Sequence, residues 1–340
     1  MKVTVIGSGT WGIALAMTLA SAGHSVTVLS SSSGKAAALS GTRIHPDLPD
    51  VRIPEAVRFT ADPPDAVPDA EILLPVVASP YLRSVMSRCY PYMKEGQIIA
   101  CGTKGLERDT LMTMTEVIGE VTHRRFPTVA LSGPTHAEEV VRGMPTLIVS
   151  AGEDLHAASV IQQLFVGTCI RPYTSTDTRG TELCGALKNI IALACGIASG
   201  LGLGDNTRAA IMTRGIYEIA RMGRALGCSE RTFAGLAGIG DLIVTATSLH
   251  SRNNRAGILI GQGIEPEEAI RRIGMAVEGV NALPAALALA EKYGVEIPII
   301  ASVQEIITGH KEPGEVVSEL LNRSLKPEDP GLRYEKDLLH

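Results

Sequence analysis

The first thirty residues carry the feature that most constrains the fold: a strand, a glycine turn, a helix and a second strand in direct succession. Residues 2–6, KVTVI, form a β-branched run typical of a buried strand. GSGTWG follows at 7–12, and a helical pattern then runs to Gly23, a residue type that commonly ends helices. SVTVL at 25–29 is the second strand. In this context G-x-G-x-x-G predicts dinucleotide binding.

Each glycine of this turn has a physical role in such a site. Gly7 permits the tight turn, Gly9 lets the backbone approach a pyrophosphate, and Gly12 lets the helix pack closely on the strand. The free N–H groups at the start of the helix then face the phosphates. The alternative is a glycine turn in another kind of α/β protein.

The end of the second strand bears on which dinucleotide binds. An NAD site usually places Asp or Glu there, on the ribose 2′-hydroxyl. This chain has four serines at 30–33 and Lys35 just after them. Hydroxyl groups and a nearby cation suit a 2′-phosphate, so NADP is favoured over NAD as the cofactor. The alternative is that the serines are ordinary loop residues.

The hydrophobic pattern predicts an α/β fold, an N-terminal Rossmann-like doubly wound parallel sheet followed by an all-helical C-terminal domain. Further strands are expected at 71–77, 97–102, 128–133 and 146–151, and a proline-broken loop at 62–69. Helices are expected at 181–200, 206–226, 265–274, 283–293 and 299–308. The expected units are a dinucleotide-binding domain (1–180), a helical substrate and catalytic domain (181–325) and a polar tail (326–340) whose composition allows disorder.

Composition excludes several classes of function. The chain has 31 basic and 36 acidic residues and a net charge of −5, so no overall positive field would attract nucleic acid. Six cysteines without metal-site spacing predict reduced, buried thiols and no metal. A first strand beginning at Lys2 leaves no room for a targeting peptide. No apolar run, the glycine-rich 181–200 included, looks long enough for a membrane span. A cytoplasmic location is expected.

Lys188 stands out because it lies in an apolar helical stretch. Its neighbours three and four positions away are Cys184, Gly185, Ile191 and Ala192, none of which is charged. Burial lowers the pKa of an ammonium, and such a lysine can donate or accept a proton near neutral pH. Reduction of a ketone by a nicotinamide needs such a donor. The alternative is a lysine at the helix edge that reaches water.

Three other polar positions lie in settings typical of ligand-binding sites. Lys104 follows the strand expected at 97–102, where ligands of open sheets bind, although a surface turn is the alternative. Asp241, in AGLAGIGDLIVTAT, is suited either to cap a helix or to accept a hydrogen bond from Lys188 or a substrate hydroxyl. SRNNR at 251–255 offers guanidinium and amide donors for a phosphate or carboxylate; a solvated loop is the alternative.

Taken together, the segments identify a family resemblance from residue 2 to about 321. The chain resembles the soluble NAD(P)-dependent glycerol-3-phosphate dehydrogenases of bacterial type. The matching segments, in the order of the family, are VIGSGTWGIALA, TKGLE, LSGPTHAEEV, GALKNIIALACGI, GLAGIGDLIVTATS, SRNNR and VEG…YGVEIPI. Seven ordered segments are far more specific than one motif.

The resemblance implies an oxidoreductase that interconverts dihydroxyacetone phosphate and sn-glycerol 3-phosphate, supplying the latter for phospholipid synthesis. Lys188 matches the catalytic lysine of the family. The residues implied to contact substrate are Lys104, Gly133, Thr135, Lys188, Asp241, Ser251, Arg252 and Asn253. Those implied to contact the cofactor are Gly7, Gly9, Thr10, Trp11, Gly12, Ser31, Lys104, Ala137, Arg252, Ala276 and Glu278. A homodimer is a further expectation from the family.

The sequence departs from the family pattern in three places. Ala78-Ser79-Pro80 stands where the family usually has Pro-Ser-His, near the nicotinamide end. Ser31 replaces a His or Arg often found beside the adenosine ribose, and the tail after Arg323 has no counterpart. Two rival functions are a β-hydroxyacid-type dehydrogenase acting on another small substrate and a non-catalytic NADP-binding regulator.

Overall fold

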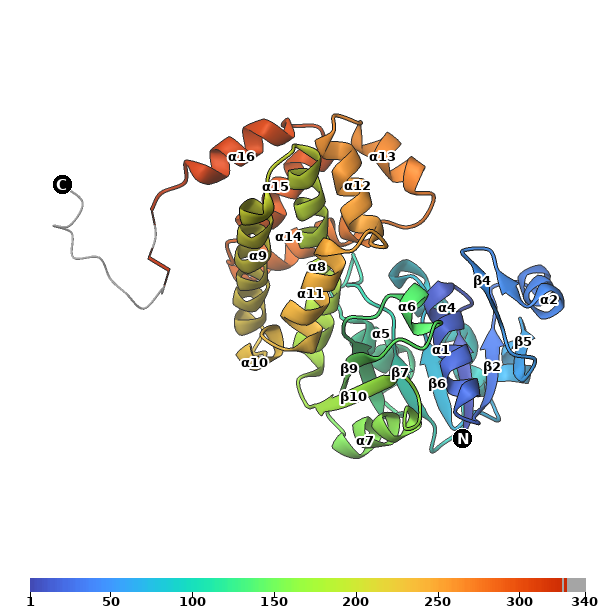
Figure 1. The fold of residues 1–340 in the computed structure, drawn as a ribbon. Coiled ribbons are helices and arrows are strands. Elements are labelled where there is room, and N and C mark those ends of the chain that lie inside the picture. The colour runs from blue at the N-terminus through green and yellow to red at the C-terminus, as the bar shows by residue number, and fades with distance from the viewer. Residues whose placement is uncertain (326, 329–340) are drawn as a thin grey trace.

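The computed structural model of the protein describes residues 1–325, 327 and 328 (Figure 1). Its N-terminal part is an eight-stranded sheet in the order β10-β9-β8-β7-β6-β1-β2-β5. The strands are β1 (Lys2–Ile6), β2 (Ser25–Leu29), β5 (Val57–Thr60), β6 (Ile72–Pro75), β7 (Ile98–Cys101), β8 (Thr128–Ser132), β9 (Thr146–Ala151) and β10 (Ile170–Ser175). A separate hairpin pairs β3 (Ile44–His45) with β4 (Leu48–Arg52).

The sheet is not wholly parallel, and the expectation of a fully parallel sheet is wrong at one pair. Strands β8 and β9 run antiparallel, while every other neighbouring pair of the large sheet is parallel. Parallel neighbours need a long crossover, usually through a helix. The link between β8 and β9 contains only the single-turn helix α6 (Ala137–Val140), so the chain returns directly beside β8.

Helices cover the sheet and then form a body of their own (Figure 1). The helices of the N-terminal part, besides α6, are α1 (Thr10–Ser21), α2 (Ser33–Thr42), α3 (Pro63–Ala66), α4 (Leu82–Cys89), α5 (Met114–Val121) and α7 (Leu155–Leu164). After β10, every element in the described part of the chain is helical. These are α8 (Thr178–Gly200), α9 (Asp205–Ala225), α10 (Glu230–Phe233), α11 (Asp241–Thr247), α12 (Arg252–Gly261), α13 (Pro266–Ile273), α14 (Glu278–Tyr293), α15 (Pro298–Ile307) and α16 (Pro313–Leu321).

The fold class and most of the expected elements are confirmed. All six expected strands and all five expected helices are present, with ends shifted by a few residues. The expected loop at 62–69 is wrong in part, because Pro63 occupies the first turn of α3, where its missing N–H costs nothing. Strands β5 and β10 were not expected, since both are edge strands with mixed polarity. The expected tail lies, apart from 327 and 328, outside the described residues.

Helix α8 corrects the expectation that no segment could span a membrane. By length and composition it is apolar enough to cross one, but 89% of its most apolar 18-residue window is buried inside the protein. Leu187, Ile190 and Ile191 lie fully buried at the centre of the helical body. The apolar character of α8 therefore reflects its place as the core helix of this part, which α9, α11, α12 and α14 surround.

Glycines allow α8 and α12 to pack backbone against backbone. A methyl group added at Gly257 would overlap the carbonyl oxygen of Leu193, and one added at Gly196 would overlap that of Asn254. Gly200 and Gly261 meet the facing helix in the same way one turn further on. Such close approach is possible only without side chains at the crossing, and it fixes the start of α12 relative to α8.

We predict that Gly257→Ala lowers the free energy of unfolding by about 2 kcal/mol, because overpacking at this crossing forces the helices apart. Urea denaturation of the full chain measures the effect. Gly41→Ala is the matched control, since Gly41 lies in α2 and a methyl group there would meet nothing within 4 Å. Equal losses in the two variants would contradict the packing argument.

Candidate active site

Lys188 is buried at the meeting point of α8 and α11. Its side chain is 6% exposed, and its Nζ donates hydrogen bonds to Asp241 Oδ1 and, at 2.7 Å, to Thr245 Oγ1. Asp241 is the first residue of α11, and the glycine-rich turn before it, 236–240, brings its carboxylate down onto α8. The alternative of a lysine that reaches bulk water is thus excluded, and Asp241 is confirmed as a hydrogen-bond acceptor for Lys188.

Lys104 approaches the same carboxylate from the sheet. It follows β7, and its Nζ donates to Asp241 Oδ2 at 2.7 Å and to the carbonyl oxygen of Gly133 at 3.2 Å. Gly133 directly follows β8, so both groups lie at the carboxyl ends of adjacent parallel strands. Thr135 stays beside them, its hydroxyl donating to the same carbonyl at 3.1 Å. The Asp241 carboxylate therefore bridges two ammonium groups, one from each part of the protein.

Burial and charge set the ionisation of this cluster. Burial lowers the pKa of Lys188 to about 7, with Lys104 adding to the effect and Asp241 opposing it. For Asp241, burial alone would raise the pKa, but the two neighbouring ammonium groups together hold it below its ordinary value. The cluster thus contains a permanent carboxylate beside an amine that can gain or lose a proton near neutral pH.

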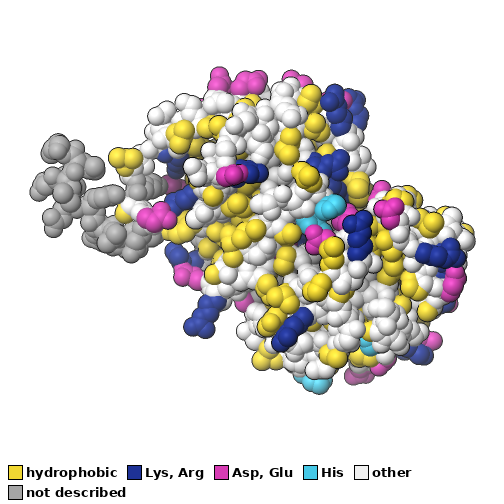
Figure 2. All heavy atoms as spheres, viewed as in Figure 1, with side chains coloured by type: hydrophobic (Ala, Val, Ile, Leu, Met, Phe, Trp, Pro, Cys, Tyr) yellow, Lys and Arg dark blue, Asp and Glu magenta, His cyan; other side chains and the backbone are white. Residues whose placement is uncertain are grey.

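The SRNNR segment forms the start of α12, not a loop. Ser251 caps the helix, its Oγ accepting from the Asn254 amide at 3.2 Å, and Arg252 is the first helical residue. Asn253 points inward: its Nδ2 donates to Asn189 Oδ1 at 3.0 Å, and its Oδ1 accepts from the Gly279 amide at 2.8 Å. In Figure 2, basic, acidic and histidine side chains gather where the helical part meets the sheet.

The glycine turn has the geometry that a dinucleotide requires. Gly7 has a φ of 122°, and Gly12 lies so close to the Gly7 carbonyl that a side chain could not fit. A methyl group added at Gly9 would meet nothing within 4 Å, which leaves room for a phosphate. Helix α1 begins there with no side-chain cap and no acidic residue in its first turn, so its N–H groups are open to an anion. These residues fit an NAD(P) pyrophosphate.

A cavity of about 320 Å³ continues from this turn along the end of β2. Gly7, Gly9 and the exposed Ser31 line it. Thr10 and Trp11 are half-buried in the first turn of α1. The cavity has the place and size expected for the adenosine half of a dinucleotide.

Of the other expected cofactor residues, Glu278 and Lys104 lie together beside the Lys188 cluster. Glu278 begins α14 and shares a small hollow with Ser79, Lys104 and Asn189. Ser79 belongs to the unusual Ala78-Ser79-Pro80 segment, which leads into a 3₁₀ turn at Ser79–Tyr81, so this segment lies beside the cluster. Ala137 is buried in α6, whereas Ala276 is exposed just before α14.

Two residues of the cluster were not expected from the sequence. Thr245 binds the Lys188 ammonium, and Asn189 orients Asn253. The spacing carried a signal for Thr245, because residues four apart on a helix share a face and Thr245 is four residues beyond Asp241. Asn189 follows Lys188 directly, but its partner on α12 is 64 residues away in sequence.

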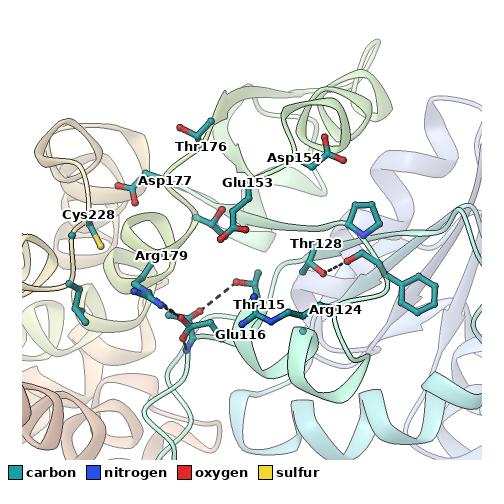
Figure 3. Close-up of a pocket in the computed structure, with 17 residues that line it drawn as sticks. Thr115, Glu116, Arg124, Thr128, Glu153, Asp154, Thr176, Asp177, Arg179 and Cys228 are labelled. Carbon is teal, nitrogen blue, oxygen red and sulfur yellow. Dashed lines mark hydrogen bonds and ion pairs between the residues drawn. The ribbon is translucent and has the colours of Figure 1, made fainter.

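A second cavity, of about 490 Å³, lies away from this cluster (Figure 3). Arg179 and Glu116 form an ion pair on its wall. Asp177 caps α8 there and also accepts hydrogen bonds from the Ser229 amide and, at 2.5 Å, from the Thr232 hydroxyl. None of the residues expected to contact substrate or cofactor lines this cavity. The candidate active site is therefore the Lys188 cluster, not this cavity.

The fold and the site together define a class: a two-part dehydrogenase that uses a nicotinamide dinucleotide, with a buried lysine on the first long helix after the sheet. Family models described as NAD-dependent glycerol-3-phosphate dehydrogenase N-terminus and C-terminus match residues 2–158 and 177–318. The chain belongs to the NAD-dependent glycerol-3-phosphate dehydrogenase family.

Individual relatives and a solved structure support this assignment to the family. The chain is 49% identical to glycerol-3-phosphate dehydrogenase [NAD(P)+] 2 of Lactobacillus delbrueckii, over 96% of this chain and 98% of that protein. It is 47% identical to the glycerol-3-phosphate dehydrogenase [NAD(P)+] of Fusobacterium nucleatum, over 96% and 98%. The crystal structure of glycerol-3-phosphate dehydrogenase from Coxiella burnetii superimposes with a TM-score of 0.91 at 35% identity, over 95% of this chain and 99% of that one.

We predict that Asp241→Asn lowers the free energy of unfolding by about 3 kcal/mol, because it leaves two ammonium groups without a counter-charge, one of them buried. Chemical denaturation at pH 7 measures the change. Asp109→Asn, which removes an exposed carboxylate of the same kind, should change stability little. Unchanged stability of Asp241→Asn would show that the carboxylate does not bridge the two lysines in solution.

Proposed function

We propose that this protein interconverts dihydroxyacetone phosphate and sn-glycerol 3-phosphate with NAD(P)(H). The observation that carries the proposal is the buried Lys188 ammonium, held by Asp241 beside the carboxyl ends of β7 and β8. Relatives that share 42–49% of their residues with this chain are named for the same reaction. The supply of glycerol 3-phosphate for phospholipid synthesis is the role that the family resemblance implies.

Lys188 moves the proton. Reduction of the ketone places a hydride, which the bound nicotinamide supplies, on the carbonyl carbon and a proton on the oxygen. Because the pKa of Lys188 is lowered to about 7, its ammonium can give that proton readily and its amine can take it back in the reverse reaction. Asp241 holds the amine in place, and Lys104 adds a second positive charge toward the developing alkoxide.

The start of α12 holds the phosphate. Arg252, half-buried in the first turn of α12, offers a planar fork of donors, and the helix N-terminus favours an anion. Ser251 caps this turn through the Asn254 amide, Asn253 ties it to Asn189 and to the Gly279 amide, and Asn253 keeps one N–H for the ligand. Gly133 and Thr135 close the opposite side, beside Lys104. Fixing the phosphate in this way fixes the carbonyl relative to Lys188.

The cofactor extends from the glycine turn to the same cluster. Gly7, Gly9 and Gly12 admit the pyrophosphate, and the serines at the end of β2 favour NADP. The remaining proposed contacts, from the family resemblance, are Thr10, Trp11, Ser31, Lys104, Ala137, Arg252, Ala276 and Glu278. The two family models, which divide between 158 and 177, support a dinucleotide-binding domain at 1–180 and a helical catalytic domain at 181–325.

A cytoplasmic location and a homodimer complete the proposal. The burial of α8 and the six free cysteines support the location. The homodimer follows from the family resemblance.

We predict that Lys188→Ala lowers kcat with dihydroxyacetone phosphate and NADPH by on the order of 10²–10⁴, because the general acid is lost. Cofactor affinity, measured by fluorescence titration, should stay within about twofold, since the substitution leaves the glycine turn and its cavity unchanged. In the wild type, kcat/KM for reduction should fall as pH rises above about 7, when Lys188 loses its proton, and oxidation should show the reverse trend. Near-normal turnover in Lys188→Ala would reject this mechanism.

We predict that Arg252→Ala raises the KM for dihydroxyacetone phosphate by about 10–100-fold, because a charge-assisted hydrogen bond to the phosphate is lost. Arg255→Ala, three residues along the same helix and exposed, is the matched control. Steady-state assays with varied substrate distinguish the two. A flat KM in Arg252→Ala would remove Arg252 as the phosphate anchor, and activity only on a hydroxy acid would favour the rival dehydrogenase reaction.

A further inference from the structure

A second buried contact, besides the pair of Lys104 and Asp241, joins α8 to the sheet part. Glu182 of α8 is 6% exposed, and its carboxylate accepts from the Thr115 amide at 2.8 Å and from the Thr115 hydroxyl at 2.5 Å. Thr115 lies in the first turn of α5, where the N–H groups have no partner within the helix and a negative charge is favoured. The Glu182 carboxylate therefore holds the start of α5 against α8.

An ion pair on the protein surface reinforces the same contact. Arg179, one turn before Glu182 on α8, donates from Nε to Glu116 Oε1 at 3.0 Å. Thr115, Glu116 and Arg179 lie together in Figure 3. Because the Arg179 side chain is 51% exposed, this pair contributes little by itself. The buried carboxylate of Glu182 is the stronger link between the two helices.

The start of α5 is also the end of the loop that carries Lys104. This loop, residues 102–113, closes on itself through a β-bridge between Leu106 and Thr113. Leu106, two residues after Lys104, is 7% exposed and belongs to the hydrophobic core of the helical part. Holding Thr115 against α8 therefore fixes this loop as well, and with it the position from which the Lys104 ammonium enters the site.

We propose that Glu182 is a positioning residue for the reaction: it holds the loop of Lys104 against α8 and so sets how close Lys104 comes to Asp241 and Lys188. The proposal deepens the proposed function and rests on it for the reaction that is measured. Glu182 acts through α5 and the loop, and it lies six residues before Lys188, about 9 Å along the helix axis. Its partner Thr115 is 67 residues away in sequence, so no local motif reveals the contact.

Glu218 offers a matched control, because it makes the same kind of contact inside the helical part. It is 2% exposed, and its carboxylate accepts from the Ile299 and Ile300 amides, at 2.8 and 3.2 Å, at the start of α15. Burial raises the pKa of both Glu182 and Glu218 to about 7. Replacing either carboxylate by a methyl group should therefore cost similar stability, but only the contact of Glu182 crosses to the sheet part.

The test is a steady-state assay of Glu182→Ala, Glu182→Gln and Glu218→Ala with dihydroxyacetone phosphate and NADPH, beside urea denaturation of each variant. Glu182→Ala should lower kcat by about 10–100-fold, because misplacing a group in the site is costly, and leave NADPH affinity within about twofold. Glu182→Gln keeps an acceptor for the Thr115 amide and should recover most of the loss. Glu218→Ala should lose stability and keep the wild-type kcat.

The pH profile provides a readout that a loss of stability alone does not move. Lys188 faces Asp241 and Lys104, with His136 nearby, and the Lys104 ammonium helps to lower the pKa of Lys188. When Lys104 is no longer held in place, the pKa of Lys188 should rise. The fall in kcat/KM for reduction should then occur at higher pH in Glu182→Ala, whereas Glu182→Gln, which removes the titration of Glu182 itself, should keep the wild-type profile.

Thr115→Val keeps the experiment decisive even when Glu182→Ala does not fold. It removes only the hydroxyl donor, so it should lower kcat and move the pH profile in the same direction to a smaller extent. A wild type that reduces dihydroxyacetone phosphate, together with wild-type kcat and pH profile in Glu182→Ala or Thr115→Val, would overturn the proposal. Failure of the proposed function looks different, because the wild type itself would then not reduce this substrate.

Discussion

The carboxylate of Asp241, shared by two ammonium groups, is the interaction on which the rest of the active site depends. Lys188 comes from the central helix of one part of the protein, and Lys104 comes from the strand ends of the other. Removing water from three charges is costly unless each is paired, and here one carboxylate serves both cations. The result is a site in which the two parts are joined by one carboxylate and the two ammonium groups that it pairs.

The requirement for a dry lysine explains the composition of α8. A helix buried on all sides must be apolar around its whole circumference, and this is why α8 resembles a membrane span in sequence. Three polar residues of α8 interrupt this apolar surface and make hydrogen bonds to other elements. Lys188 and Asn189 do so in the candidate active site, and Glu182 accepts from the amide and hydroxyl of Thr115. Burial raises the pKa of Glu182 to about 7. Lys188, Asn189 and Glu182 thus each have a partner from another element, whereas the buried hydroxyl of Thr181 has no hydrogen-bond partner in the structure.

The sequence predicted those features of the fold and the site that depend on local residue patterns and spacing. The glycine turn, the two-part fold and the unusual setting of Lys188 are local features, and the structure agrees with them. The antiparallel return of β9 was not predictable, because strand direction depends on how a short link crosses the sheet. The pairing of Asn189 with Asn253 depends on a contact between α8 and α12, which are distant in sequence, and no periodicity records it.

The close packing of α8 against α12 at Gly196 and Gly257 also constrains how the parts of the site can move. Interlocked backbones cannot slide past one another without losing many contacts, so Lys188 on α8 and Arg252 on α12 are held in a fixed relation. Any rotation of the helical part against the sheet would therefore move the two residues together. The ion pair between Lys104 and Asp241 is the charged link that such a rotation would strain.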